Sequence, residues 1–283
     1  MNINNLANNL ERFGEVGTII VKNDGTVSRR SEEIVSEHFM DVVVDEKLAA
    51  RLVCTPDNLV ELVMGRLLTE NIVSSADDVE HIYICEEGRR AKVFLKPEVC
   101  AVLEPTYKLE PTCCTGNKIF LQNRFIKEKK DSTAAEKQLR NKDKPEGTFW
   151  KKEWIFELAK NFAEGAFLHS RTKGTHSCYL SVKGRTVFAA EDIGRHNALD
   201  KVIGYAALHG ILYEDCIVFT SGRVPTDMIV KVLSVGIPVM VSKAVPTDEA
   251  IKMAEENGLT LICRAWPDSF EIYTGEFPDS GLC

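Results

Sequence analysis

Apolar residues in the first part of the chain form short runs separated by turn residues. The β-branched runs at 18–22 and 41–45 predict strands joined by hairpins. Thr55 is then predicted as a helix N-cap and Pro56 as the first helical residue, and the following apolar residues recur at helical spacing. We therefore predict that residues 1–125 are β-rich and contain one amphipathic helix.

The C-terminal half alternates between two patterns. A strand hairpin is predicted first, and the later apolar runs at 216–220, 238–242 and 260–263 are separated by stretches of helical periodicity. Strands and helices that alternate at this spacing predict a mostly parallel sheet with covering helices. Residues 154–283 are thus expected to form an α/β domain.

The segment between these halves, residues 126–153, has a different composition. It contains charges of both signs and few apolar residues before Phe149, which is typical of a connection that adds little to a core. We interpret it as a mobile charged linker between the β-rich part and the α/β domain.

Charge and cysteine content exclude several classes of protein. The chain has 283 residues and a formal net charge of -7, with both signs interspersed, so it offers no positive field for nucleic acid. It contains neither an apolar run of membrane-spanning length nor a basic, apolar leader pattern, which predicts a cytoplasmic protein without a membrane partner. Nine cysteines without a C-x-x-C pair predict neither a disulfide framework nor a structural metal site.

Three predicted turns follow strand ends and combine small with cationic residues. They are residues 194–196, 221–223 and 242–247. Turns at the carboxyl ends of parallel strands share one sheet edge, where helix N-termini attract anions, so Arg195, Arg223 and Lys243 are predicted to hold phosphates. The alternative is that each turn is only a tight αβ connection, and that His176 and His196 are structural hydrogen-bonding residues.

Cys113 and Cys114 lie in a polar stretch rather than in an apolar strand. A thiol in such a loop is expected to be exposed, and nearby Lys118 would favour the thiolate, which is the nucleophilic form. The pair is therefore the candidate for sulfur chemistry.

The motif at residues 191–204, Glu-Asp-Ile-Gly-Arg-His-Asn-Ala-Leu-Asp-Lys-Val-Ile-Gly, resembles that of the formate dehydrogenase accessory sulfurtransferases. Residues 220–223, 236–247 and 65–70 are similar to further motifs of that family. The resemblance implies a cytidine-deaminase-like three-layer sandwich with a smaller β-rich N-terminal domain, and a homodimer. A zinc-dependent deaminase is disfavoured because residues 221–225 contain no cysteine ligand.

The resemblance also implies a mechanism. Cys113 aligns with the first cysteine of the family's loop and is expected to take a persulfide from a cysteine desulfurase. It would deliver the sulfur to the molybdenum (or tungsten) bis(guanine dinucleotide) cofactor of formate dehydrogenase, which is bound as the object of sulfuration. Gly116 stands where the family has its second cysteine, and Cys114 where it has glycine. The alternative is a cofactor carrier or chaperone without sulfur transfer.

The turns and the resemblance together give a set of expected cofactor-binding residues. The set includes the histidine kept at the end of the family's Thr-Gly-Gly-x-His motif and the segment that the family associates with the guanine dinucleotide. Its members are His176, Arg195, His196, Ser221, Gly222, Arg223, Lys243, Pro246, Thr247, Arg264, Ala265, Trp266, Pro267, Asp268 and Ser269.

Overall fold

The computed structural model describes residues 1–99, 108–109, 119–120 and 150–278. Cys113, Cys114 and most of the predicted linker lie outside these residues. Between residues 99 and 150 the structure describes two short strands, β8 (Lys108–Leu109) and β9 (Ile119–Phe120). In the described part of the chain, no helix is long and apolar enough to cross a membrane.

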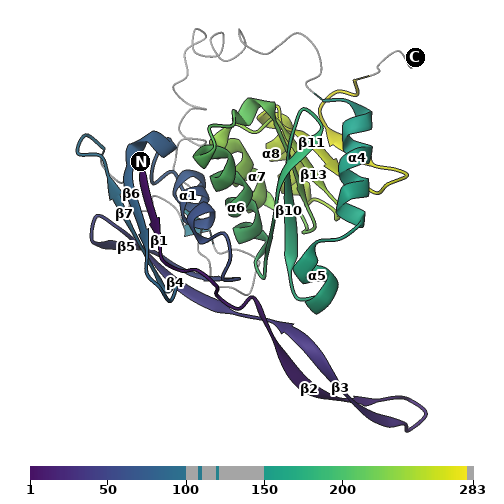
Figure 1. Cartoon of the computed structure of the whole chain (residues 1–283). Coiled ribbons are helices and arrows are strands. Elements are labelled where there is room, and N and C mark those ends of the chain that lie inside the picture. The colour runs from purple at the N-terminus through teal and green to yellow at the C-terminus, as the bar shows by residue number, and fades with distance from the viewer. Residues whose placement is uncertain (100–107, 110–118, 121–149, 279–283) are drawn as a thin grey trace.

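The N-terminal half forms a five-stranded sheet and a separate hairpin, as its short β-branched runs predict. The sheet has the order β1-β6-β7-β4-β5. Its strands are β1 (Asn2–Asn5), β4 (His38–Val44), β5 (Lys47–Cys54), β6 (Val79–Ile84) and β7 (Arg90–Leu95), with the 3-10 turn η1 (Ala76–Asp78) before β6. The hairpin of β2 (Phe13–Val21) and β3 (Val27–Val35) projects from the body of the molecule (Figure 1).

The C-terminal half is built on a six-stranded sheet of order β11-β10-β12-β13-β14-β15. Only β12, β13 and β14 are mutually parallel, and the pairs at both ends are antiparallel. The prediction of a mostly parallel sheet was therefore wrong, because short hairpin connections return the chain antiparallel at each end. The strands are β10 (His176–Val182), β11 (Arg185–Asp192), β12 (Cys216–Thr220), β13 (Val239–Ser242), β14 (Thr260–Cys263) and β15 (Glu271–Thr274).

Helices cover both faces of this second sheet. Successive side chains of β12 alternate between two cores: Val218 packs with the cluster around α6 and α7, whereas Phe219 packs with α4 and Trp150. Figure 1 shows the resulting three layers, in agreement with the predicted sandwich, with α1 and the first sheet stacked beyond α6. The helices are α1 (Leu59–Thr69), α4 (Lys152–Ala163), α5 (Phe167–Thr172), α6 (Arg195–Leu208), α7 (Thr226–Val235) and α8 (Asp248–Glu256), with η2 (Tyr213–Asp215) before β12.

Two glycines let α1 of the first half lie directly against α6 of the second. A Cβ built on Gly65 would come within 1.8 Å of the Asp200 carbonyl oxygen, and one on Gly204 within 1.9 Å of the Glu61 carbonyl oxygen. Both distances are far below contact, so the helix backbones touch at a crossing that only glycine permits. This crossing brings charged side chains of the two halves together.

The first buried charge cluster centres on Lys201 of α6. Its ammonium lies 2.9 Å from Asp192 and 2.5 Å from Asp57 and donates to the Thr55 hydroxyl at 2.8 Å. Burial alone would lower the pKa of Lys201, but these two carboxylates raise it above its usual value. The predicted N-cap role of Thr55 was wrong, because α1 begins after Asn58 and the Thr55 hydroxyl serves this cluster instead.

The second buried cluster centres on Lys231 of α7. Its ammonium lies 2.9 Å from an Asp200 oxygen, donates to the Thr69 hydroxyl at 2.8 Å and lies 3.5 Å from Glu70. Arg66 pairs with Glu70 at 3.2 Å. Asp192 and Asp200 thus join the two halves of the chain.

Candidate pocket at the sheet edge

Five strand ends meet at one edge of the second sheet. β11, β12, β13 and β14 end there, and β10 begins there, since His176 pairs with Asp192. Backbone hydrogen bonds join the following turns: Lys243 N–H to Thr220 O at 3.1 Å, and Ala265 N–H to Ser242 O at 3.1 Å. The shared edge predicted from the turns is therefore confirmed, and it positions the functional side chains.

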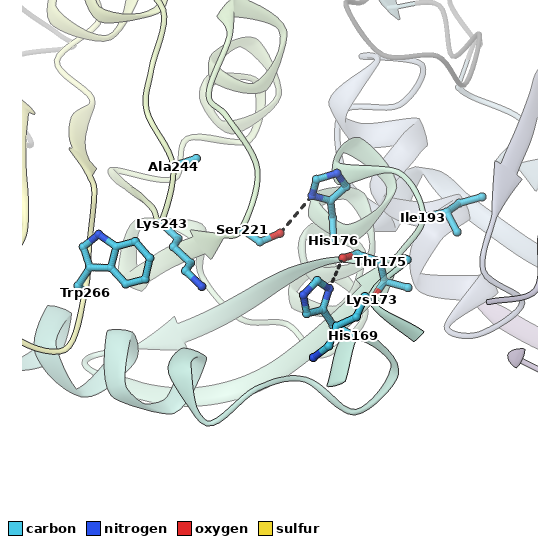
Figure 2. Close-up of a pocket in the computed structure, with 10 residues that line it drawn as sticks. His169, Lys173, Thr175, His176, Ile193, Ser221, Lys243, Ala244 and Trp266 are labelled. Carbon is cyan, nitrogen blue, oxygen red and sulfur yellow. Dashed lines mark hydrogen bonds between the residues drawn. The ribbon is translucent and has the colours of Figure 1, made fainter. Parts of the chain in front are cut away.

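A pocket of about 540 Å³ opens at this edge (Figure 2). It lies between the turn before β10 on one side and the turns after β12, β13 and β14 on the other. Its described lining consists of His169, Lys173, Gly174, Thr175, His176, Ile193, Ser221, Lys243, Ala244 and Trp266.

The pocket is suited to an anion. Lys173 and Lys243 are exposed cations in its wall, and the described lining contains no carboxylate. The Lys243 ammonium lies 4.7 Å from the centroid of the Trp266 ring, whose side chain is 43 % exposed. An exposed indole beside lysines offers a stacking surface for a base together with charge for phosphates.

Glu191 holds one wall of the pocket in place. Its carboxylate accepts the backbone N–H groups of Leu168 at 2.7 Å and His169 at 2.6 Å, and the Thr175 hydroxyl at 3.1 Å. The N–H groups at the start of α5 are thereby satisfied, as a short helix requires. This buried carboxylate fixes His169 and Thr175 relative to β11.

Two histidines face the pocket from this wall. The His169 Nδ1 atom lies 2.7 Å from the Thr175 carbonyl oxygen, and the His176 Nδ1 atom lies 3.2 Å from the Ser221 hydroxyl (Figure 2). Burial, followed by the charge of Arg195, lowers the pKa of His176 below its usual value. His176 is therefore uncharged at neutral pH.

Four of the expected cofactor-binding residues line the pocket: His176, Ser221, Lys243 and Trp266. They come from different turns, and the fold brings these residues, which lie far apart in the sequence, into one pocket.

Arg195, His196 and Gly222 lie behind the pocket rather than in its described lining. Arg195 is 8 % exposed and His196 1 % exposed. The His196 Nε2 atom lies 3.0 Å from Asp227, whose pKa is lowered because the contacts with His196 and the charge of Arg195 outweigh burial. A Cβ on Gly222 would approach the Cδ atom of Arg195 to 2.9 Å, so this glycine makes room for the aliphatic stem of that buried side chain.

The remaining expected residues also lie outside the described lining. Arg223 is exposed, Pro246 bridges to Val224, and the Thr247 hydroxyl caps α8 by accepting the Ala250 N–H. Ala265 is buried, and Arg264 pairs with Glu271 at 3.2 Å. Pro267, Asp268 and Ser269 are exposed in the turn after Trp266, where the Trp266 N–H bonds the Ser269 carbonyl at 2.7 Å.

Sequence reasoning missed the wall formed by α5 and the turn after it. His169, Lys173, Thr175 and the supporting Glu191 were not predicted as site residues. Their position in the sequence could have indicated part of this wall, because residues 173–175 directly precede His176, which was predicted as a cofactor-binding residue and is the first residue of β10.

Four described cysteines are poor nucleophiles. Cys54, Cys178, Cys216 and Cys263 are buried, and burial raises the pKa of each thiol, to about 12 for Cys216 and for Cys263. A nucleophilic thiol is therefore expected only among the cysteines outside these strands.

Native alkylation tests this selectivity. Iodoacetamide at pH 7.5 is expected to leave these four cysteines unmodified over the time in which Cys113 reacts, because alkylation requires an accessible thiolate. Peptide mass spectrometry gives the modified positions, and alkylation in guanidinium chloride, where all nine cysteines should react, is the control. Fast native labelling of Cys178 would contradict the assignment.

The fold defines an α/β protein with a pocket lined by Lys173 and Lys243 at a sheet edge, attached to a β-rich half through buried ion pairs. Residues 35–277 match the FdhD/NarQ family, and the chain belongs to that family. The resemblance inferred from the motif at residues 191–204 is thus confirmed.

Individual relatives agree with this assignment. The sulfur carrier protein FdhD of Bacillus subtilis is 30% identical over 251 residues, which cover 88% of this chain and 91% of the relative. That of Listeria monocytogenes serotype 4b is 29% identical, with 89% and 93% covered. A solved structure of a formate dehydrogenase accessory protein from Desulfotalea psychrophila superposes with a TM-score of 0.70 at 20% identity, covering 94% of this chain and 98% of that one. This last similarity supports the fold.

Proposed function

We propose that this chain is a sulfurtransferase that carries a persulfide on Cys113 and sulfurates the molybdenum (or tungsten) bis(guanine dinucleotide) cofactor for formate dehydrogenase. A cysteine desulfurase is the proposed sulfur donor, a formate dehydrogenase the recipient, and the cytoplasm the compartment. Membership of a family whose curated members are named sulfur carrier proteins supports the sulfur chemistry. The cationic pocket supports the choice of cargo.

The proposed transfer has two balanced steps. The Cys113 thiolate attacks the terminal sulfur of the donor's persulfide, the sulfur–sulfur bond of the donor breaks, and the donor cysteine leaves as a thiolate. In the second step the new persulfide bond on Cys113 breaks and Cys113 leaves as a thiolate. The terminal sulfur would form a bond to the metal of the bound cofactor, and the two electrons that convert this sulfur to sulfide would come from that metal in its reduced state.

The observation that carries the ligand assignment is the combination of lysines and indole in a lining without described carboxylates. A guanine dinucleotide offers a planar base for Trp266 and phosphate charge for Lys173 and Lys243. Uncharged His176 adds a hydrogen-bonding group at the opposite wall. The pocket therefore fits one nucleotide portion of the cargo.

Mass spectrometry tests the sulfur step directly. After incubation with a cysteine desulfurase and cysteine, we expect one added sulfur atom on the peptide that contains Cys113, removable by a reducing thiol. An added sulfur on Cys114 alone would move the role to its neighbour. A protein that binds the cofactor but accepts no sulfur would establish the alternative, a carrier without transfer.

Lys243→Ala is expected to weaken binding of GDP, the test fragment of the cofactor, by roughly tenfold, because a lost charge-assisted contact has about this effect. Arg223→Ala is the matched control. Arg223 was predicted from sequence as a phosphate contact, but it is exposed outside the described lining and its loss should change affinity less than threefold. Isothermal calorimetry measures both. Equal losses would mean that the phosphates also contact Arg223 in the turn after β12.

A further inference from the structure

We propose that Ser221 acts through His176: its hydroxyl fixes the ring in the tautomer that carries hydrogen on Nε2. His176 then presents an uncharged hydrogen-bond donor to the pocket. The role of this donor in nucleotide binding rests on the proposed function, whereas the tautomer itself does not.

The direction of the hydrogen bond follows from the donors around Ser221. The Ser221 oxygen already accepts the backbone N–H of Ser177 at 3.0 Å. The hydroxyl hydrogen still needs an acceptor, and the one that the described residues place within reach is the Nδ1 atom of His176, at 3.2 Å. A serine hydroxyl that donates to Nδ1 leaves the ring hydrogen on Nε2.

The surroundings of His176 keep the ring neutral. It is half-buried at the start of β10, with Arg195 and His196 of α6 and His169 of α5 around it, and burial and these charges all lower the pKa. Asp192 at the end of β11 acts in the opposite direction, but its effect is the smallest of these. It is also engaged elsewhere, with Lys201 at 2.9 Å.

His169 gives the pocket the complementary group. Its Nδ1 atom faces the Thr175 carbonyl oxygen at 2.7 Å, and a carbonyl only accepts, so the hydrogen lies on Nδ1. In an uncharged ring with that tautomer, the Nε2 atom of His169 is an acceptor. The two histidines therefore offer different functions, and the ligand atom that meets His176 must be an acceptor, such as a phosphate oxygen or a purine ring acceptor.

Histidine nitrogen NMR tests the tautomer without any ligand. In protein labelled with nitrogen-15 at its six histidines, with His176→Gln used for assignment, the His176 resonances should show the Nε2–H tautomer at pH 7 and pH 8. Ser221→Ala should lose this pattern, giving a tautomer mixture, and Ser221→Thr, which keeps the hydroxyl, should restore it. A wild-type Nδ1–H tautomer, a charged ring at pH 7, or an unchanged pattern in Ser221→Ala would overturn the proposal.

Binding of GDP then tests the consequence for the ligand. We expect affinity to fall about three- to tenfold in Ser221→Ala, the range for one lost neutral hydrogen bond, and to recover in Ser221→Thr. Unchanged affinity in Ser221→Ala would remove His176 from ligand binding. If GDP fails to bind the unaltered protein, the assignment of this pocket to the nucleotide falls, whereas the NMR result still decides the role of Ser221.

Discussion

Cells that depend on this chain for formate dehydrogenase maturation are expected to lose that activity when Cys113 is replaced by alanine. Alanine has no sulfur atom on which a persulfide could form, so the loss of formate dehydrogenase activity should be complete rather than partial. The described cysteines offer no substitute within the strands, because Cys54, Cys178, Cys216 and Cys263 are buried with raised pKa values. Formate oxidation in extracts, normalised to the amount of formate dehydrogenase protein, is the measurement.

Cys114→Ala is the matched control for this experiment. Cys114 occupies a glycine position of the family's loop, so its loss should leave most of the activity. Both variants should melt like the unaltered protein, because a thiol in a polar loop adds little to the core. Full activity in Cys113→Ala would refute the assignment, and equal losses would show that the two cysteines work as a pair.

Gly65→Ala is expected to destabilise the protein by about 3 kcal/mol or more. The new methyl group would lie 1.8 Å from the Asp200 carbonyl oxygen, which forces α1 away from α6. Separation of these helices would also disturb the buried pairs of Lys231 with Asp200 and Glu70. The gain of about 1 kcal/mol that alanine brings to a helix over glycine is too small to offset these losses. Guanidinium unfolding followed by circular dichroism gives the free energy of unfolding.

Gly17→Ala serves as the control glycine. Gly17 lies in the projecting strand β2, and nothing comes within 4 Å of a Cβ built there, so its replacement should change the free energy of unfolding by less than about 0.5 kcal/mol. If Gly65→Ala were as stable as Gly17→Ala, the close crossing of α1 and α6 would be wrong.

The sequence by itself determined the elements whose cause is local. The β2–β3 hairpin, the helix α1 and the strands β12 to β14 follow from apolar periodicity and turn residues. They lie where that pattern predicts them, except that α1 begins at Leu59 rather than directly after Thr55. The small and cationic residues after two predicted strands were also enough to predict that Ser221 and Lys243 meet at one edge of the sheet. They meet because β12 and β13 are parallel, so their carboxyl ends lie side by side.

Only the tertiary structure decided the function of the charged residues in the 191–204 motif. Arg195 and Asp200 look alike in sequence as polar residues of an amphipathic helix, yet both are buried. The burial of Asp200 is possible because α1, some 130 positions earlier, brings partners such as Thr69, whose hydroxyl donates to Asp200 at 2.9 Å. A pattern read along one segment carries no information about which distant segment covers it. For the same reason Glu191, whose partners lie on α5, could be recognised as the support of the pocket only once the chain was folded.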